Sequence, residues 1–440
     1  MSSNVIKNTS GFFFRHLMFL GICLLVLAVG LVAISAKSSQ SSSAGVLNAT
    51  DKAITAAQQK VAMYATTAKY KITLCNLYIQ KSRETADTSY YSKCDSLLAD
   101  ALKLEPMNGD IIAAQASVAY GRHDFVKGLD LAQQALVINP NRPVYYGLVG
   151  DGQIELGQYP EAAASFQTMV NKRPDLSSFN RVGYIRELYG DIAGAKTALS
   201  SAISSGSSFS ENTAYSQVEL AKLLGRTDLD AATNIYRQAL ETRADFPPAL
   251  EGLGKIAFAR GDYAGALKYF NQAFDSLPLA QYATDLGDTY ATQGNKTKAT
   301  QQYYLATIAF DKSSTGGVNN DYEKSVFLND HDMDLQKANA LLVKSLSVRP
   351  NIFTKDALAW NYYKLKDYTK AQASIESALE IGSTEPIINY HAGMIAAKLG
   401  QTDIAKTYLQ KAFSQDRYFL ESHFSLLDKS IGTNQLNHLQ

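Results

Sequence analysis

The sequence has little of what most catalytic and metal sites require. Its 440 residues include three cysteines and six histidines, and no two histidines stand at the spacing of metal ligands. It carries no signature of a Ser–His–Asp triad, no phosphate-binding loop, and no HExxH or CxxC motif. We therefore predict that the protein is not an enzyme and that it has no cofactor and no metal site.

An excess of charge of one sign is also lacking. The chain has 42 lysines and arginines against 41 aspartates and glutamates, for a net charge of +1. No strong field attracts it to nucleic acid, so we predict no nucleic-acid partner. An apolar content of 46% with 19% charged residues is typical of a globular protein, and the length exceeds that of one ordinary compact core.

One long apolar run lies near the N-terminus. Residues 17–36 read LMFLGICLLVLAVGLVAISA and carry no formal charge, and at ~1.5 Å per residue a helix of this length spans the ~30 Å hydrocarbon core. Lys7 and Arg15 precede it. The positive-inside rule therefore predicts a single-pass membrane protein with residues 1–16 as a cytoplasmic tail and the rest extracytoplasmic. The alternative is a signal peptide cleaved near Ala36, which would give a secreted protein.

Proline marks a period in the chain that follows. Pro106, Pro140 and Pro174 each close a helical stretch, and they stand 34 residues apart. A period in this range indicates stacked supersecondary units. Each unit contains two amphipathic segments joined by a short turn that often holds glycine.

Residues 251–278 read EGLGKIAFARGDYAGALKYFNQAFDSLP and contain four glycines. Glycine clusters also occur in nucleotide-binding loops, so this alternative is compared with a helix pair. The GLGKIA stretch lacks the third glycine of the dinucleotide fingerprint and follows no predicted strand. Two helices explain the glycines better, because Gly254 of the first faces Ala266 of the second and Gly261 ends the first helix. We therefore predict a helix pair here.

The units resemble the tetratricopeptide repeat (TPR), a module of two antiparallel helices. The first helices carry a recurrent small residue, at Ala116, Gly150, Gly183, Gly254, Gly287, Ala359 and Gly393, although Leu220 departs from this pattern. The second helices carry another recurrent small residue near their start, at Gly128, Ala162, Ala195, Ala232, Ala266, Ala299, Ala338, Ala371 and Ala405. The resemblance covers residues 75–418. It implies an all-α fold, a right-handed α-solenoid of about ten TPR-like helix pairs, preceded by one transmembrane helix.

Other segments flank or interrupt this array. A Ser-rich linker is predicted over residues 37–50, a lead helix over residues 51–74, and a C-terminal capping helix and tail over residues 419–440. Within the array, residues 204–211 and 311–321 are predicted to be flexible loops.

Two further features have a functional and a structural interpretation. Residues 329–334, NDHDMD, resemble the start of a calcium loop, but Leu335 and Leu341 stand where that loop needs Gly and Glu, so we predict an acidic turn between two helices. The repeat register puts Cys75 and Cys94 roughly 10 Å apart along the helix axis, beyond the ~7 Å that a disulfide spans. We therefore predict free thiols, with Cys94 as a small packing residue.

In TPR proteins the first helices line a concave groove that receives a peptide or a partner helix. Carried over position by position, the resemblance implies a partner-binding groove that includes Asp151, Glu155, Asn180, Tyr184, Glu187, Gln217, Glu251, Lys255, Asp285, Asp288, Trp360, Tyr363 and Tyr390. Acids outnumber bases among the lining positions, which favours a basic partner. Trp360 either anchors a partner or packs between units.

The sequence thus predicts a membrane-anchored scaffold or adaptor that binds a protein or peptide partner in extracytoplasmic envelope assembly or secretion. Two alternatives stay open. The same array could face the cytoplasm and recruit a soluble partner, or it could be an accessory factor to an envelope-polymer enzyme. Neither the partner nor the oligomeric state can be predicted from the sequence.

Overall fold

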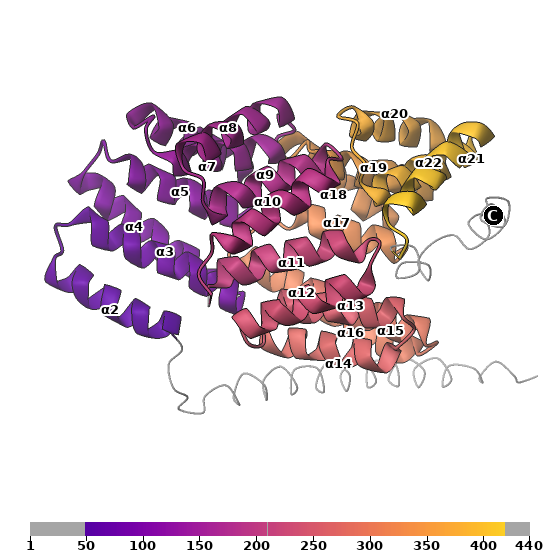
Figure 1. Ribbon diagram of the computed structural model, residues 1–440, viewed down its shortest axis with the longest axis horizontal. Coiled ribbons are helices and arrows are strands. Elements are labelled where there is room, and N and C mark those ends of the chain that lie inside the picture. The colour runs from indigo at the N-terminus through magenta and orange to yellow at the C-terminus, as the bar shows by residue number, and fades with distance from the viewer. Residues whose placement is uncertain (1–48, 209, 419–440) are drawn as a thin grey trace, which may run out of the picture. The chain divides into compact units, whose positions relative to one another are not determined.

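The described part of the chain is entirely helical. A computed structural model describes residues 49–208 and 210–418, and within these ranges it contains α-helices and no strand (Figure 1). The chain divides into two units, residues 1–53 and 54–440. A first helix, α2 (Ala49–Met63), precedes ten consecutive helix pairs.

Each pair has a first helix, a short turn and a second helix, as the repeat resemblance predicts. The pairs are α3 (Ala68–Thr85) with α4 (Ser89–Leu104), α5 (Gly109–Gly121) with α6 (Phe125–Ile138), α7 (Pro143–Glu155) with α8 (Tyr159–Lys172), α9 (Leu176–Leu188) with α10 (Ile192–Ser204), α11 (Glu211–Gly225) with α12 (Leu229–Thr242), α13 (Pro247–Ala259) with α14 (Tyr263–Ser276), α15 (Ala280–Thr292) with α16 (Lys296–Thr315), α17 (Asp321–Asp330) with α18 (Leu335–Val348), α19 (Ile352–Lys364) with α20 (Tyr368–Leu379), and α21 (Pro386–Lys398) with α22 (Thr402–Gln415).

The turns within the pairs share one local design. In seven of the second helices an Asp or Asn at the N-cap accepts a hydrogen bond from a backbone N–H of the first turn, which satisfies a donor that the helix leaves unpaired. In α14 the cap is Asp262, and Gly261 just before it has a φ of 75°, a left-handed conformation that favours glycine. The chain therefore reverses in a few residues and sets the two helices antiparallel.

The small residues lie at the crossing of the two helices, as predicted. A Cβ atom added to Gly254 would lie 2.4 Å from the ring of Phe270, and one added to Gly150 would lie 2.3 Å from the ring of Phe166. The small residues that open the second helices are fully or almost fully buried, at Ala162, Ala195, Ala232, Ala266, Ala299, Ala338, Ala371 and Ala405. Small side chains on both helices thus let the backbones approach closely.

Some predicted segments differ in the structure. The lead helix predicted over residues 51–74 is divided, because α2 ends at Met63 and α3 begins at Ala68. Much of the loop predicted over residues 311–321 is helical, because α16 continues to Thr315. The acidic turn is present between α17 and α18, where Asp334 caps α18.

The predicted anchor over residues 17–36 and the capping segment over residues 419–440 lie outside the described residues. Among the residues that are described, no helix has the length and hydrophobicity needed to cross a membrane.

The prediction of free thiols is wrong. Cys75 and Cys94 form a disulfide, with their Cα atoms 4.8 Å apart. The predicted array begins at Cys75, whereas α3 begins at Ala68. Cys75 therefore lies in the middle of its helix and level with Cys94 on α4. Cys94 is fully buried, as expected of the small residue of a second helix.

The close crossing at Gly254 predicts the effect of a larger residue. We expect Gly254→Leu to lower the free energy of unfolding by ~1–3 kcal/mol, because the added side chain overpacks against Phe270. Ala264→Leu, on the exposed side of α14, is the matched control and should change stability little. Denaturant unfolding measures both, and equal stability of the two variants would contradict the observed crossing.

The disulfide predicts a redox-dependent mass. The intact chain should gain two hydrogens on reduction, and mapping under non-reducing conditions should recover one peptide pair that contains Cys75 and Cys94. Its loss should also lower the unfolding free energy by ~2–4 kcal/mol. The Cys94→Ala variant is the control, and an unchanged mass in the wild-type chain would show that these thiols are free.

Candidate functional site

The predicted groove residues lie along the first helices of successive pairs. Asp151 and Glu155 are on α7, and Asn180, Tyr184 and Glu187 are on α9. The remaining positions are Gln217 on α11, Glu251 and Lys255 on α13, Asp285 and Asp288 on α15, Trp360 and Tyr363 on α19, and Tyr390 on α21. Most of these positions fall into three groups. Some form ion pairs with distant parts of the chain, some are buried in the core, and some line a cavity.

Turns in the first half of the array contact loops in the second half. The carbonyl of Arg122, after α5, accepts a hydrogen bond of 3.0 Å from the backbone N–H of Asn319, just before α17. The hydroxyl of Tyr159, at the start of α8, accepts one of 2.7 Å from the backbone N–H of Ile352. The carbonyl of Arg226, after α11, accepts one of 2.8 Å from the N–H of Arg417. We call these the cross-array contacts.

Arginines reinforce the cross-array contacts. Arg349, in the loop before α19, donates to Glu155 at 2.7 Å and to Glu323 at 2.8 Å, and its side chain is 18% exposed. Arg226 donates to Glu187 at 2.6 Å and to Glu385 at 3.2 Å. These charged groups are partly shielded from water, so removing one partner costs more than it does for an exposed ion pair.

Burial changes the acidity of one of these carboxyl groups. The pKa of Glu187 is raised to about 7, because burial disfavours its charged form and Glu385 adds repulsion, while Arg226 opposes both effects. A carboxyl group in this state changes charge near neutral pH.

The aromatic groove positions are part of the core. Trp360, Tyr363 and Tyr390 are 4%, 6% and 2% exposed. Trp360 stacks on Tyr363 at a ring-centroid distance of 4.5 Å and on His391 at 4.1 Å. These positions support packing between units, the second of the two roles considered for Trp360.

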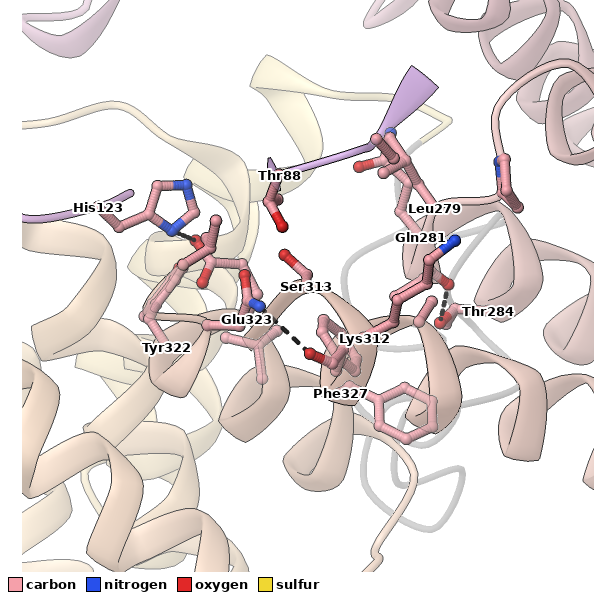
Figure 2. Close-up of a pocket in the computed structure, with 18 of the residues that line it drawn as sticks. Thr88, His123, Leu279, Gln281, Thr284, Lys312, Ser313, Tyr322, Glu323 and Phe327 are labelled. Atoms are coloured by element: carbon pink, nitrogen blue, oxygen red, sulfur yellow. Dashed lines mark hydrogen bonds and ion pairs between the residues drawn. The ribbon is translucent and has the colours of Figure 1, made fainter. Parts of the chain in front are cut away.

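The predicted positions on α13 and α15 are brought together at a cavity. Glu251, Lys255, Asp285 and Asp288 line a space of about 760 Å³ between α13, α15, α16 and α17 on one side and the turns after α3 and α5 on the other. Figure 2 shows the facing groups, with Thr88 above Ser313 and the ring of His123 turned toward Glu323. Five carboxylates and three lysines or arginines line this cavity, so its lining is acidic.

Several of these carboxylates already have partners. Glu251 pairs with Lys255 at 2.7 Å and accepts from Gln281 at 3.2 Å. Asp288 accepts from the Tyr303 hydroxyl at 2.8 Å and contacts His331 Nε2 at 2.8 Å. Burial lowers the pKa of His331, but its bond with Asp288 outweighs this and leaves the pKa raised.

Asp285 differs from its neighbours. Its Oδ2 atom is shielded from solvent, and no group in the described residues donates a hydrogen bond to it. Burial raises the pKa of this carboxyl well above its usual value, Lys255 opposes the shift, and Glu251 and Asp288 add to it. Ionising this carboxyl group without a partner is therefore unfavourable in the free protein.

The sequence did not reveal the side chains that connect distant parts of the array. Arg349 and Arg226 lie outside the first helices, and no local pattern connects them with their partners. His123 contacts Glu323 at 3.7 Å from a turn 200 residues away. Within the described ranges, no three His, Cys, Asp or Glu side chains are placed to hold a metal ion.

Tetratricopeptide repeat models match two parts of the sequence. One matches residues 222–280 and 254–315, and another matches residues 356–381 and 387–419. The repeats predicted from the sequence are therefore confirmed, and the array is a repeat scaffold suited to protein–protein interaction. No curated protein sequence matches the chain.

Solved structures resemble the array at low identity. Human IFIT1, solved as a dimer with PPP-AAAA, is 13% identical with a TM-score of 0.47, over 72% of this chain and 73% of that one. A tetratricopeptide repeat protein from Parabacteroides merdae is 16% identical with a TM-score of 0.41, over 55% and 97%. The APC/C hetero-tetramer Cut9–Hcn1 is 15% identical with a TM-score of 0.37, over 81% of this chain and 62% of the matched chain.

The cross-array contacts predict the effect of removing Arg349. We expect Arg349→Met to lower the free energy of unfolding by ~2 kcal/mol or more, because it leaves Glu155 and Glu323 without their cation. Amide hydrogen exchange should also rise at the α7–α8 turn. Arg173→Met is the control, because that arginine is 69% exposed in its pair with Asp175. Equal exchange in the two variants would contradict the contact.

Proposed function

We propose that the protein is a membrane-anchored TPR scaffold that binds a protein or peptide partner through the inner face of its array, which is the face lined by the first helices of the pairs. The observation that carries the proposal is the acidic cavity on the first helices, where Glu251, Asp285 and Asp288 meet within a repeat fold suited to protein–protein interaction. Its lining favours a basic partner, whose association should slow as salt rises. The site is built for recognition, and the proposal includes no catalytic step.

The anchor in this proposal is the apolar run of residues 17–36. Lys7 and Arg15 before this run favour a cytoplasmic N-terminus and an array on the far side of the membrane. The disulfide between Cys75 and Cys94 supports the same side, because such bonds persist mainly in oxidising compartments. We therefore propose a role in extracytoplasmic envelope assembly or secretion.

A topology reporter tests the location. An enzyme that is active only in an oxidising compartment, fused after Gln440, should be active in intact cells and remain with the membranes. An inactive reporter would place the array in the cytoplasm. An active reporter that is released from the membranes would indicate cleavage near Ala36.

A crosslinking pull-down from membranes tests the binding face. We expect Asp285→Lys to remove the main crosslinked partner, because it reverses the charge at the centre of the cavity. Glu241→Lys, at an exposed position of α12, makes the same change outside the cavity and should keep the partner. The same partners with both variants would remove the inner face as the binding site.

A further inference from the structure

We infer that the cavity receives a lysine or arginine side chain of a basic peptide, and that Asp285 is the carboxylate that pairs with it. This inference rests on the proposed function and names the chemistry of recognition at the same site. Some charged groups in the cavity have partners and others do not.

The first observation is the unpaired carboxylate. Oδ2 of Asp285 is enclosed, and among the described residues it has no hydrogen-bond donor. Lys255 is the nearby cation, but its Nζ atom is 2.7 Å from Glu251. A buried charge without a partner is unfavourable, and an incoming ammonium or guanidinium group would supply the missing donors.

A second oxygen on another wall has the same property. Oε2 of Glu323, on α17, is shielded and has no hydrogen-bond partner among the described residues. The other oxygen of this carboxylate accepts from Arg349 at 2.8 Å. The cavity thus offers acceptors on both α15 and α17, and a guanidinium group has several donors in a fixed plane.

Apolar residues of the lining can pack against the methylene groups of a long cationic side chain. Leu279, Phe310, Val326 and Phe327 line the same cavity as the carboxylates, and Lys and Arg bury their methylene groups along such surfaces. The volume of about 760 Å³ lies within the ~300–1,000 Å³ of ligand pockets. It therefore has room for a side chain together with part of its backbone.

In the free protein no peptide cation pairs with Asp285, and this lowers the stability of the fold. Asp285 lies beside Glu251 and Asp288 on the cavity wall. Burial disfavours its charged form, Lys255 offsets this effect in part, and the two acidic neighbours add to it. A cation in the cavity removes the repulsion. The same residue is therefore expected to destabilise the free protein and to stabilise the complex, a combination that a purely structural aspartate would not give.

The test uses the purified chain and a fluorescein-labelled hexalysine peptide. Fluorescence anisotropy should show binding to the wild type, and Asp285→Asn should weaken it by at least about tenfold. Glu241→Gln is the control and should bind like the wild type. Asp285→Glu keeps the charge and should retain most of the affinity.

Thermal unfolding without peptide gives the second measurement. Asp285→Asn should unfold at a higher temperature than the wild type while it binds hexalysine more weakly. An equal affinity of Asp285→Asn and wild type would overturn the inference, and so would a variant that is less stable or fails to fold.

Two further results separate the sources of the cation. Spermidine that competes as well as hexalysine would assign the site to small polyamines and contradict the peptide. Absence of hexalysine binding, with a partner still captured in the membrane pull-down, would overturn the inference and leave the proposed scaffold function standing.

Discussion

The array depends on the close crossing of two helices over a residue with little or no side chain. At Gly254 and Gly150 an aromatic ring of the second helix occupies the space that a side chain would need. This contact sets the distance between the helices of a pair, and the repetition of that distance sets how each pair stacks on the next. The position of every inner-face residue follows from it.

The cross-array contacts add a second level of order. A repeat array stabilised by nearest neighbours alone would leave its first helices open along their length. Here Arg349 pairs with Glu155 across 194 residues of sequence. Arg226 joins Glu187 of the neighbouring pair to Glu385, 159 residues further along the chain. Asp285, in contrast, lines a cavity among the described residues and has a carboxylate oxygen without a hydrogen-bond donor, and this cavity is the site that we propose for recognition.

The sequence predicts what repeats locally. The period of small residues was enough to predict about ten helix pairs and the crossing at Gly254, and the resemblance to the repeat family was enough to place Glu251 and Asp285 on successive first helices. It could not predict the pairing of Arg349 with Glu155, because their separation of 194 residues leaves no local pattern. The disulfide was missed because the start of α3 lacks the repeat motif, and the boundary error moved Cys75 by about two turns of helix.

The most direct test of the account is an engineered crosslink across the array. A Cβ atom placed on Gly190 would lie 3.2 Å from the Cβ of Thr384, close to the separation across a disulfide. The double variant Gly190→Cys with Thr384→Cys should therefore form this bond on mild oxidation, and non-reducing peptide mapping should recover the two segments joined. If both new thiols stay free while the native disulfide forms, the two halves of the array are not in contact at Gly190 and Thr384, and the account of the cross-array contacts is contradicted.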